Sequence, residues 1–121
     1  MRVLVAEDDR VVSTLIVGML RGRGHEPVPV FDAMQVLMFA MRAPQPDVIV
    51  LDINMPGGTG VEALKKLKRS VKTTMIPVIV LSGSPDAAMP QTVVELGAAE
   101  FLPKPLDRDA LLAALERVVQ T

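Results

Sequence analysis

Short apolar runs rich in β-branched residues recur along the chain, separated by longer segments of mixed polarity. Three of these runs are continuous rather than alternating, at residues 3–6, 48–51 and 78–81. Continuous apolar runs are typical of strands covered on both faces, as in a parallel sheet under helices. Weaker runs lie at residues 27–30 and 99–102, and two prolines in the first of these favour a place at or near the sheet edge.

The segments between the runs predict helices, and their order predicts a fold class. The expected helices cover residues 9–21, 33–42, 59 or 60 to 68, 86–96 and 107–119. Asp32, Asp86 and Asp107 can cap three of them and Asp9 the first, whereas Pro90 is tolerated only in a first turn and favours a late start there. Strands and helices alternating five times predict an α/β fold with a doubly wound, five-stranded parallel sheet and helices on both faces.

Length and composition narrow the function classes. With 121 residues, the chain is expected to form one domain, residues 1–121. It has no cysteine and one histidine, which excludes disulfide scaffolds and thiolate zinc sites. A net charge of −1 and 2% aromatic residues favour no direct contact with nucleic acid. No apolar stretch is long enough to cross a membrane, so a cytoplasmic protein is expected.

Polar side chains follow the strands at the points where the strands end. Glu7 and Asp8 follow the first strand, Asp52 the third, Ser82 the fourth and Lys104 the fifth. In a parallel sheet these positions share the carboxyl edge, where open α/β sheets bind ligands. We therefore expect three carboxylates, one hydroxyl and one ammonium to converge from four strands.

The chemistry of this set points to phosphate. Clustered carboxylates repel one another, and a divalent cation such as Mg²⁺ relieves the repulsion while accepting phosphate oxygens. A carboxylate such as Asp52 can attack phosphorus, with Lys104 and Ser82 contacting phosphoryl oxygens. Gly57, Gly58 and Gly60 favour a flexible loop whose backbone amides lie near the site.

Five motifs make the sequence resemble a known family. They occupy residues 7–9, 52–57, 82–83, 97–98 and 101–105. In order and spacing they are similar to the receiver domain of bacterial two-component response regulators, over the whole chain. This resemblance implies a flavodoxin-like fold with strand order 2-1-3-4-5. It also implies a signalling domain and not an enzyme, whose only catalysis is its own phosphoryl transfer and autodephosphorylation.

The resemblance implies a role for each site residue. Asp52 would accept a phosphoryl group from a histidine kinase or a histidine phosphotransfer protein. Magnesium, for which Mn²⁺ can substitute, would be bound by Asp8 and Asp52, by Glu7 through water and by the backbone carbonyl of Asn54. Asn54 and Ser84 occupy positions that tune dephosphorylation in the family.

The resemblance also implies a conformational switch. Ser82 and Lys104 would bind phosphoryl oxygens, and Phe101 would turn inward as Ser82 moves, repacking the face of the last two helices and strands. Phe101 is expected to be the one aromatic side chain near the site. The Lys104–Pro105 peptide bond is expected to be cis.

Two charge-free segments, residues 11–20 and 33–41, predict apolar surface on the first two helices. Val11, Leu15, Met34 and Met38 are the candidate docking residues, for a phosphodonor, an output partner or a second copy of the chain. The face of the last helix–strand–helix unit is a further candidate for the second copy or the output partner. The alternative is that polar residues such as Ser13, Thr14 and Gln35 suffice as an outer face.

Three competing functions remain open at this point. A flavodoxin-like cofactor binder shares the strand order, but acidic residues 7–9 would repel its phosphate. An aspartate-nucleophile hydrolase needs a second acid where this chain has Asn54, and also a cap domain. A pseudo-receiver would act only as an interaction module, although every position of the predicted site is filled.

Overall fold

The computed structural model of the chain describes residues 1–55, 60–83 and 86–119, and strands and helices alternate throughout them. In chain order the elements are β1 (Arg2–Ala6), α1 (Arg10–Arg21), β2 (Glu26–Val30), α2 (Ala33–Met41), β3 (Val48–Asp52), α3 (Gly60–Arg69), β4 (Val78–Ser82), α4 (Met89–Glu95), β5 (Glu100–Pro103) and α5 (Arg108–Val119). The strands form one parallel sheet in the order β2-β1-β3-β4-β5. The predicted fold class and strand order are confirmed.

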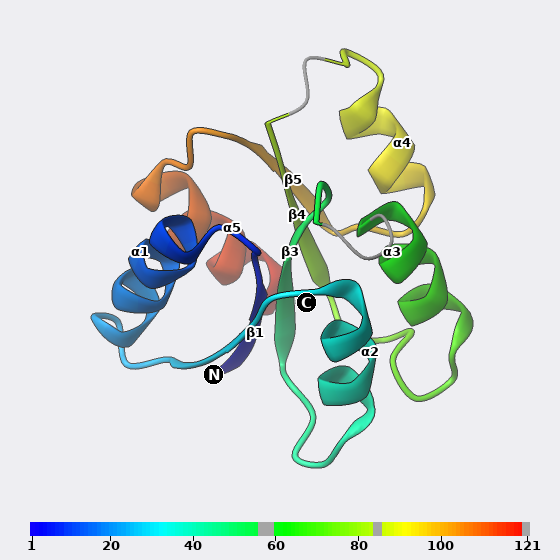
Figure 1. Cartoon of the computed structure of the whole chain (residues 1–121), viewed down its shortest axis with the longest axis horizontal. Helices are drawn as coiled ribbons and strands as arrows, with labels where there is room; N and C mark the ends of the chain where they lie inside the picture. The colour runs from blue at the N-terminus through cyan, green and yellow to red at the C-terminus, as the bar shows by residue number, and fades with distance from the viewer. Residues whose placement is uncertain (56–59, 84–85, 120–121) are drawn as a thin grey trace.

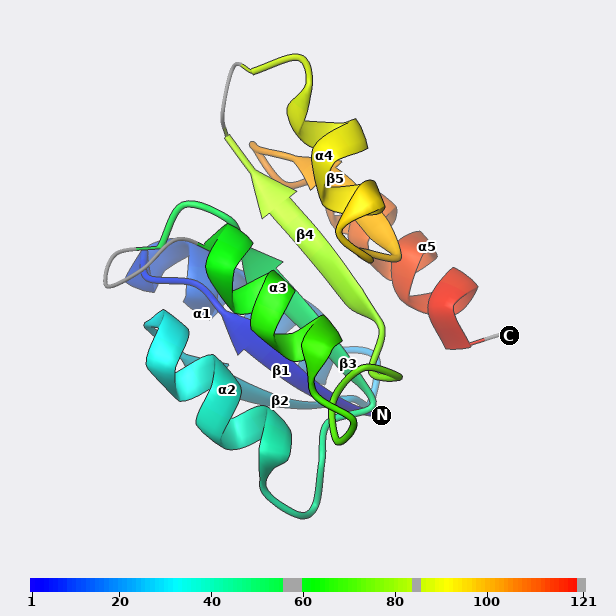
Figure 2. The same cartoon turned by 90° about the vertical axis from the view of Figure 1, so that its right-hand side faces the viewer.

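The helices cover the sheet in two layers. Figure 1 views the sheet nearly edge-on, with α1 and α5 on one side and α2, α3 and α4 on the other. Figure 2 looks onto the second side, where these three helices lie in front of the strands and run alongside them. Both faces of the sheet are therefore buried, which explains the continuous apolar runs of the central strands.

Alternate residues of each strand supply separate cores on the two faces. Leu4 and Leu51 belong to the cluster under α2, α3 and α4. Val5 and Val50 belong to the cluster under α1 and α5. Because the side-chain period of a strand is two, neighbouring residues in one strand reach opposite helical layers.

The edge position of β2 agrees with its prolines. Pro27 and Pro29 pair in register with Val3 and Val5 of β1, and β2 ends the sheet on that side. A proline has no backbone N–H to donate to a ladder, so an edge strand tolerates it where a central strand does not.

Helix caps follow the predicted aspartates with one exception. Asp9 Oδ1 accepts from the backbone N–H groups of Val11 and Val12 at 2.9 and 3.2 Å. Asp32 Oδ1 and Asp107 Oδ2 accept in the same way at the starts of α2 and α5. The prediction that Asp86 caps its helix is wrong: α4 begins only at Met89, with proline in its first turn, and has no side-chain cap bond.

Asp86 instead stabilises the turn before α4. Its Oδ1 accepts from the N–H of Ala88 at 2.9 Å, a short-range bond that holds the chain outside the helix. The proline two residues later sets the first helical turn, so the late start predicted from Pro90 is confirmed.

Candidate functional site

The polar residues expected at one sheet edge do meet there. Asp52 and Ser82 are the last residues of β3 and β4, and Lys104 directly follows β5. The backbone N–H of Lys104 donates to the carbonyl of Ser82 at 2.8 Å, and that of Glu7 donates to the carbonyl of Val30 at 3.2 Å. Main-chain hydrogen bonds across strand ends thus set the spacing of these side chains.

Three carboxylates form a compact acidic cluster. Glu7, Asp8 and Asp52 each offer one oxygen, and these oxygens lie within 4.8 Å of one another. Glu7 and Asp52 are buried, at 0% and 2% exposed, whereas Asp8 is exposed. Hard oxygen ligands in a cluster open on one side are what a small divalent cation binds best.

Lys104 joins the two buried carboxylates. Its Nζ donates to Glu7 Oε1 at 2.6 Å and lies 3.4 Å from Asp52 Oδ2. Burial opposes the ammonium charge, but the contacts with Glu7 and Asp52 outweigh it and raise the pKa of Lys104 above its usual 10.5. The side chain therefore stays a fixed positive charge at neutral pH.

Glu7 carries the largest electrostatic strain of the cluster. Burial, a hydrogen bond shared with Asp52 and the charge of Asp52 together raise the pKa of Glu7 from its usual 4.5 to about 7, although Lys104 acts in the opposite direction. Near neutral pH and without a cation, Glu7 is therefore close to half protonated.

Asp52 is held in the ionised form. Burial raises its pKa, but hydrogen bonds with Glu7 and the backbone N–H of Asn54, the charge of Lys104 and a bond with Asp8 outweigh burial and lower the pKa below its usual 3.8. Asn54 N–H donates to Asp52 Oδ1 at 3.1 Å. A buried, ionised and oriented carboxylate is suited to act as a nucleophile.

Gly60 serves the site by close packing. Its N–H donates to the carbonyl of Ile53 at 2.9 Å. A Cβ added at Gly60 would lie 2.5 Å from Ile53 Cα and 2.6 Å from the carbonyl oxygen of Asp52. The sequence suggested loop flexibility here, but for Gly60 the need is contact between the start of α3 and the end of β3. Gly57, Gly58 and Thr59, like Ser84, lie outside the described residues.

Ser82 and Phe101 lie on the same face of the sheet. Phe101 pairs in register with Val80, two residues before the buried Ser82, and packs against the cluster under α2, α3 and α4. The peptide bond between Lys104 and Pro105 is cis, and so is the bond between Ala43 and Pro44, which the sequence did not predict.

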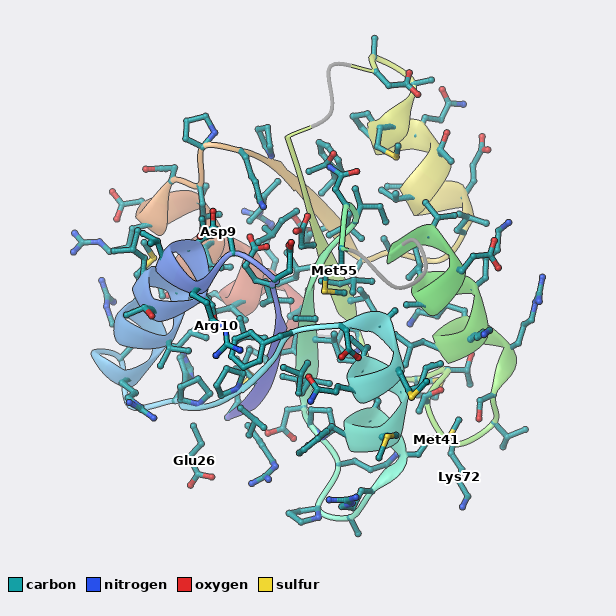
Figure 3. All side chains as sticks on the ribbon, in the orientation of Figure 1. Asp9, Arg10, Glu26, Met41, Met55 and Lys72 are labelled. Carbon is teal, nitrogen blue, oxygen red and sulfur yellow. The ribbon has the colours of Figure 1, made fainter. Side chains whose placement is uncertain are left out.

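A second aromatic side chain follows a strand at this edge of the sheet. Phe31 directly follows β2, and its ring lies 3.7 Å from the guanidinium carbon of Arg10 at the start of α1. Figure 3 labels Arg10 beside Asp9, at the amino end of the first helix. The signal was available in the sequence: Phe31 directly follows β2 as Glu7 directly follows β1.

The predicted docking residues are exposed, but they form two surfaces. Val11 and Leu15 on α1 are 70% and 57% exposed, and Met34 and Met38 on α2 are 72% and 50% exposed. The two helices cover opposite faces of the sheet (Figure 1).

Two of the polar residues considered as an outer face have other roles. Ser13 is buried, and Gln35 Oε1 accepts from the N–H of Phe31 at 2.8 Å. Thr14 is exposed, and its hydroxyl donates to the carbonyl of Arg10 within α1 at 2.8 Å. Apolar side chains therefore supply much of the outer surface of α1 and α2.

A groove between α1 and α5 adjoins the exposed residues of α1. It encloses about 420 Å³ and is lined by Thr14, Leu15, Gly18, Met19, Gly22, Arg23, Arg108 and Leu112. Its lining combines the apolar side chains of Leu15, Met19 and Leu112 with two arginines. Among the described residues, no helix is long and apolar enough to cross a membrane.

Comparison with known proteins identifies relatives of the whole chain. The model of the response regulator receiver domain matches residues 3–116. The phosphate regulon transcriptional regulatory protein PhoB of Escherichia coli is 31% identical over 119 residues, which cover 98% of this chain and 52% of PhoB. The chain thus spans about half the length of this relative.

Solved structures agree with this match. The receiver domain of sensor histidine kinase PA1611 from Pseudomonas aeruginosa, solved with a magnesium ion in its active site cleft, is 27% identical with a TM-score of 0.90, covering 99% of this chain and 98% of that one. The chemotaxis response regulator CheY4 of Vibrio cholerae is 29% identical with a TM-score of 0.88, covering 97% of both chains.

Proposed function

The chain belongs to the response regulator receiver domain family of two-component signal transduction, and from this premise we propose that it accepts a phosphoryl group on Asp52. In this proposal residues 1–121 act as one receiver domain, and the donor is a histidine kinase or a histidine phosphotransfer protein. The family is a signalling family, and the transfer is catalysed by the receiver's own residues.

The position of Asp52 carries the proposal. It ends the central strand β3 as a buried carboxylate, with Lys104 Nζ 3.4 Å from its Oδ2 and two further acids beside it. Asp8 is exposed at the same cluster and gives an incoming ligand access. Phosphoryl transfer requires positioning and charge neutralisation more than covalent chemistry, and this site supplies both.

The acidic cluster fits a magnesium ion. One oxygen of each of the three carboxylates lies within 4.8 Å of the others, so their charges repel one another. Burial, and to a lesser extent Asp52, raises the pKa of Glu7. We infer that Asp8, Asp52 and the backbone carbonyl of Asn54 bind the ion, with Glu7 acting through water, and that Mn²⁺ can replace it. The bound cation would neutralise negative charge on the phosphoryl oxygens during transfer.

In the transfer itself, covalent bonds change only between the Asp52 carboxylate and the donor. An oxygen of Asp52 attacks the phosphorus, the bond from phosphorus to the donor breaks, and its electron pair leaves with the donor group. Lys104 contributes a compact positive charge for one phosphoryl oxygen, and the Ser82 hydroxyl donates to another. Later attack by water on the phosphorus would release phosphate and restore Asp52.

A switch follows from the shared face of Ser82 and Phe101. Movement of the Ser82 hydroxyl toward a phosphoryl oxygen would open space that the half-buried ring of Phe101 can enter. Such a change would repack the surface formed by α4, β5 and α5, which would serve an output partner or a second copy.

Docking of the donor is assigned to α1. Val11 and Leu15 lie close to the site along the chain, and the groove between α1 and α5 can take apolar side chains of a helical partner. The second exposed surface, at Met34 and Met38, remains for an output partner or a second copy of the chain.

The test is covalent labelling. Acetyl phosphate with Mg²⁺ should add the mass of one phosphoryl group, and chelation of the metal should prevent the gain. Asp52→Asn should abolish labelling, whereas Asp109→Asn, a change at an exposed carboxylate, should not. Labelling of the Asp52 variant would contradict the assignment. A folded wild-type protein that neither labels nor binds Mg²⁺ and beryllofluoride would be a pseudo-receiver.

A further inference from the structure

An arginine is held in a fixed position beside the acidic site. Arg10 is the first residue of α1, one position after Asp9, and its guanidinium carbon lies 3.7 Å from the centre of the Phe31 ring. Stacking of this kind restricts the long side chain and leaves its N–H donors at the ring edge. Figure 3 shows Arg10 at the amino end of α1, directed toward the segment that joins β2 to α2.

The platform under Arg10 is itself well anchored. The N–H of Phe31 donates to Gln35 Oε1 at 2.8 Å. The preceding residue, Val30, accepts from the N–H of Glu7 at 3.2 Å. The ring that carries Arg10 therefore directly follows β2, and the last residue of β2 is bonded to Glu7 of the acidic cluster.

Among the cations at this edge of the described chain, Arg10 is the one that forms no ion pair with a carboxylate. Lys104 contacts Glu7 and Asp52, and Arg108 lies 3.8 Å from Asp109. Within residues 1–55, 60–83 and 86–119, no carboxylate forms an ion pair with Arg10. Asp9, its neighbour in the chain, is engaged as the cap of α1.

Lys104 offsets the charge of only one of the three carboxylates at this edge, so a further positive charge has a role there. A phosphoryl donor brings negative charge toward Glu7, Asp8 and Asp52, and the long-range field of these groups repels it. A positive group at the rim lowers that repulsion while the donor approaches, and it affects encounter and binding more than the chemical step.

We propose that Arg10, held on Phe31, draws the negatively charged phosphoryl group of a donor toward the site before transfer. This inference rests on the proposed function of Asp52. Arg10 acts on the donor's charge before transfer, and the bond changes at phosphorus remain those of Asp52 and the donor. The stack provides the reach and direction that a free surface arginine lacks.

The experiment measures phosphorylation of the whole chain by acetyl phosphate at increasing donor concentration. In Arg10→Gln the second-order rate constant should fall roughly five-fold at low ionic strength, through a higher half-saturating concentration and not a lower maximal rate. The difference from wild type should shrink as salt is added. Phe31→Leu should give an intermediate loss, and Arg10→Lys should retain most of the rate.

Arg21→Gln, at the other end of the same helix, serves as the matched control and should match wild type. Equal rate constants and equal salt dependence in Arg10→Gln and wild type would overturn the inference. An Arg10→Lys variant as slow as Arg10→Gln would also overturn it, because charge would then not be the property that matters. Wild type that fails to label at Asp52 would instead overturn the proposed function, so the two failures are distinguishable.

Discussion

Replacement of Glu7 by glutamine should make the metal-free protein more stable at alkaline pH. The pKa of Glu7 rises from 4.5 to about 7 in the folded protein, chiefly through burial. This difference makes ionisation of Glu7 unfavourable in the folded state by on the order of 3 kcal/mol. Glutamine resembles the protonated carboxyl in shape and hydrogen bonding, and it cannot ionise.

The sign of the pH dependence follows from proton binding. Between pH 4.5 and about 7 the folded protein holds the Glu7 proton while the unfolded chain releases it. The favourable contribution is therefore fully present below pH 4.5 and is lost as pH rises through about 7. In Glu7→Gln this fall should be absent. Above about pH 7, the free energy of unfolding of the variant should therefore exceed that of wild type by on the order of 3 kcal/mol.

Urea unfolding with chelator, followed by circular dichroism at a series of pH values, measures the effect. His25, whose pKa burial and the N-terminal charge lower, titrates in both proteins and cancels in the difference. Glu116→Gln, at an exposed carboxylate of α5, should leave the wild-type profile in place.

In place of the chelator, a second set of unfolding measurements is made with added Mg²⁺. At a hundred times its dissociation constant it should stabilise wild type by about 2.7 kcal/mol and the Glu7 variant less. The raised pKa of Glu7 would be refuted if the stability of wild type did not change with pH. It would also be refuted if the stability of Glu7→Gln fell with pH as that of wild type does.

Three further predictions concern other parts of the site. Gly60→Ala should lower the free energy of unfolding by about 2 kcal/mol or more, because the added Cβ meets backbone atoms. Gly18→Ala, in open space within α1, should instead raise it by about 0.5 to 1 kcal/mol. Equal urea midpoints for the two variants would refute this. Lys104→Met should tighten Mg²⁺ binding about ten-fold in calorimetric titration, since the competing ammonium is removed; weaker binding would contradict it. Asp9→Ala should lower thermal stability by about 1 kcal/mol through loss of two cap bonds, and an unchanged melting temperature would show that the cap contributes nothing.

Local pattern was sufficient to predict the strands and the α/β fold class, whereas the strand order was implied by the resemblance. The runs at 48–51 and 78–81 are apolar at every position, and the strands that contain them, β3 and β4, are buried along their whole length. The polar residues that follow the strands could be placed because a parallel sheet brings its carboxyl ends to one edge. The start of α4 was harder to predict, since Asp86 and Pro90 are competing signals within five residues and the proline prevails.

Contacts between distant elements could not be predicted from pattern. In the sequence, Gly60 indicated flexibility. Its actual role could not be predicted, because the Cβ clash that it avoids is with Ile53, which is seven residues away in the chain. The stack of Arg10 on Phe31 depends on β2 lying beside β1, and on the exact turn of α1, neither of which local periodicity specifies.

The division of the sheet into two faces affects which partner proteins can bind the receiver domain at the same time. The groove between α1 and α5 lies over one face, and the side chains of Phe101 and Ser82 belong to the other, under α3 and α4. Helix α5 borders both the donor groove and the proposed output surface of α4, β5 and α5. A donor seated in the groove would leave α4 and β5 uncovered, so a three-protein complex is sterically compatible with an output partner that binds through α4 and β5.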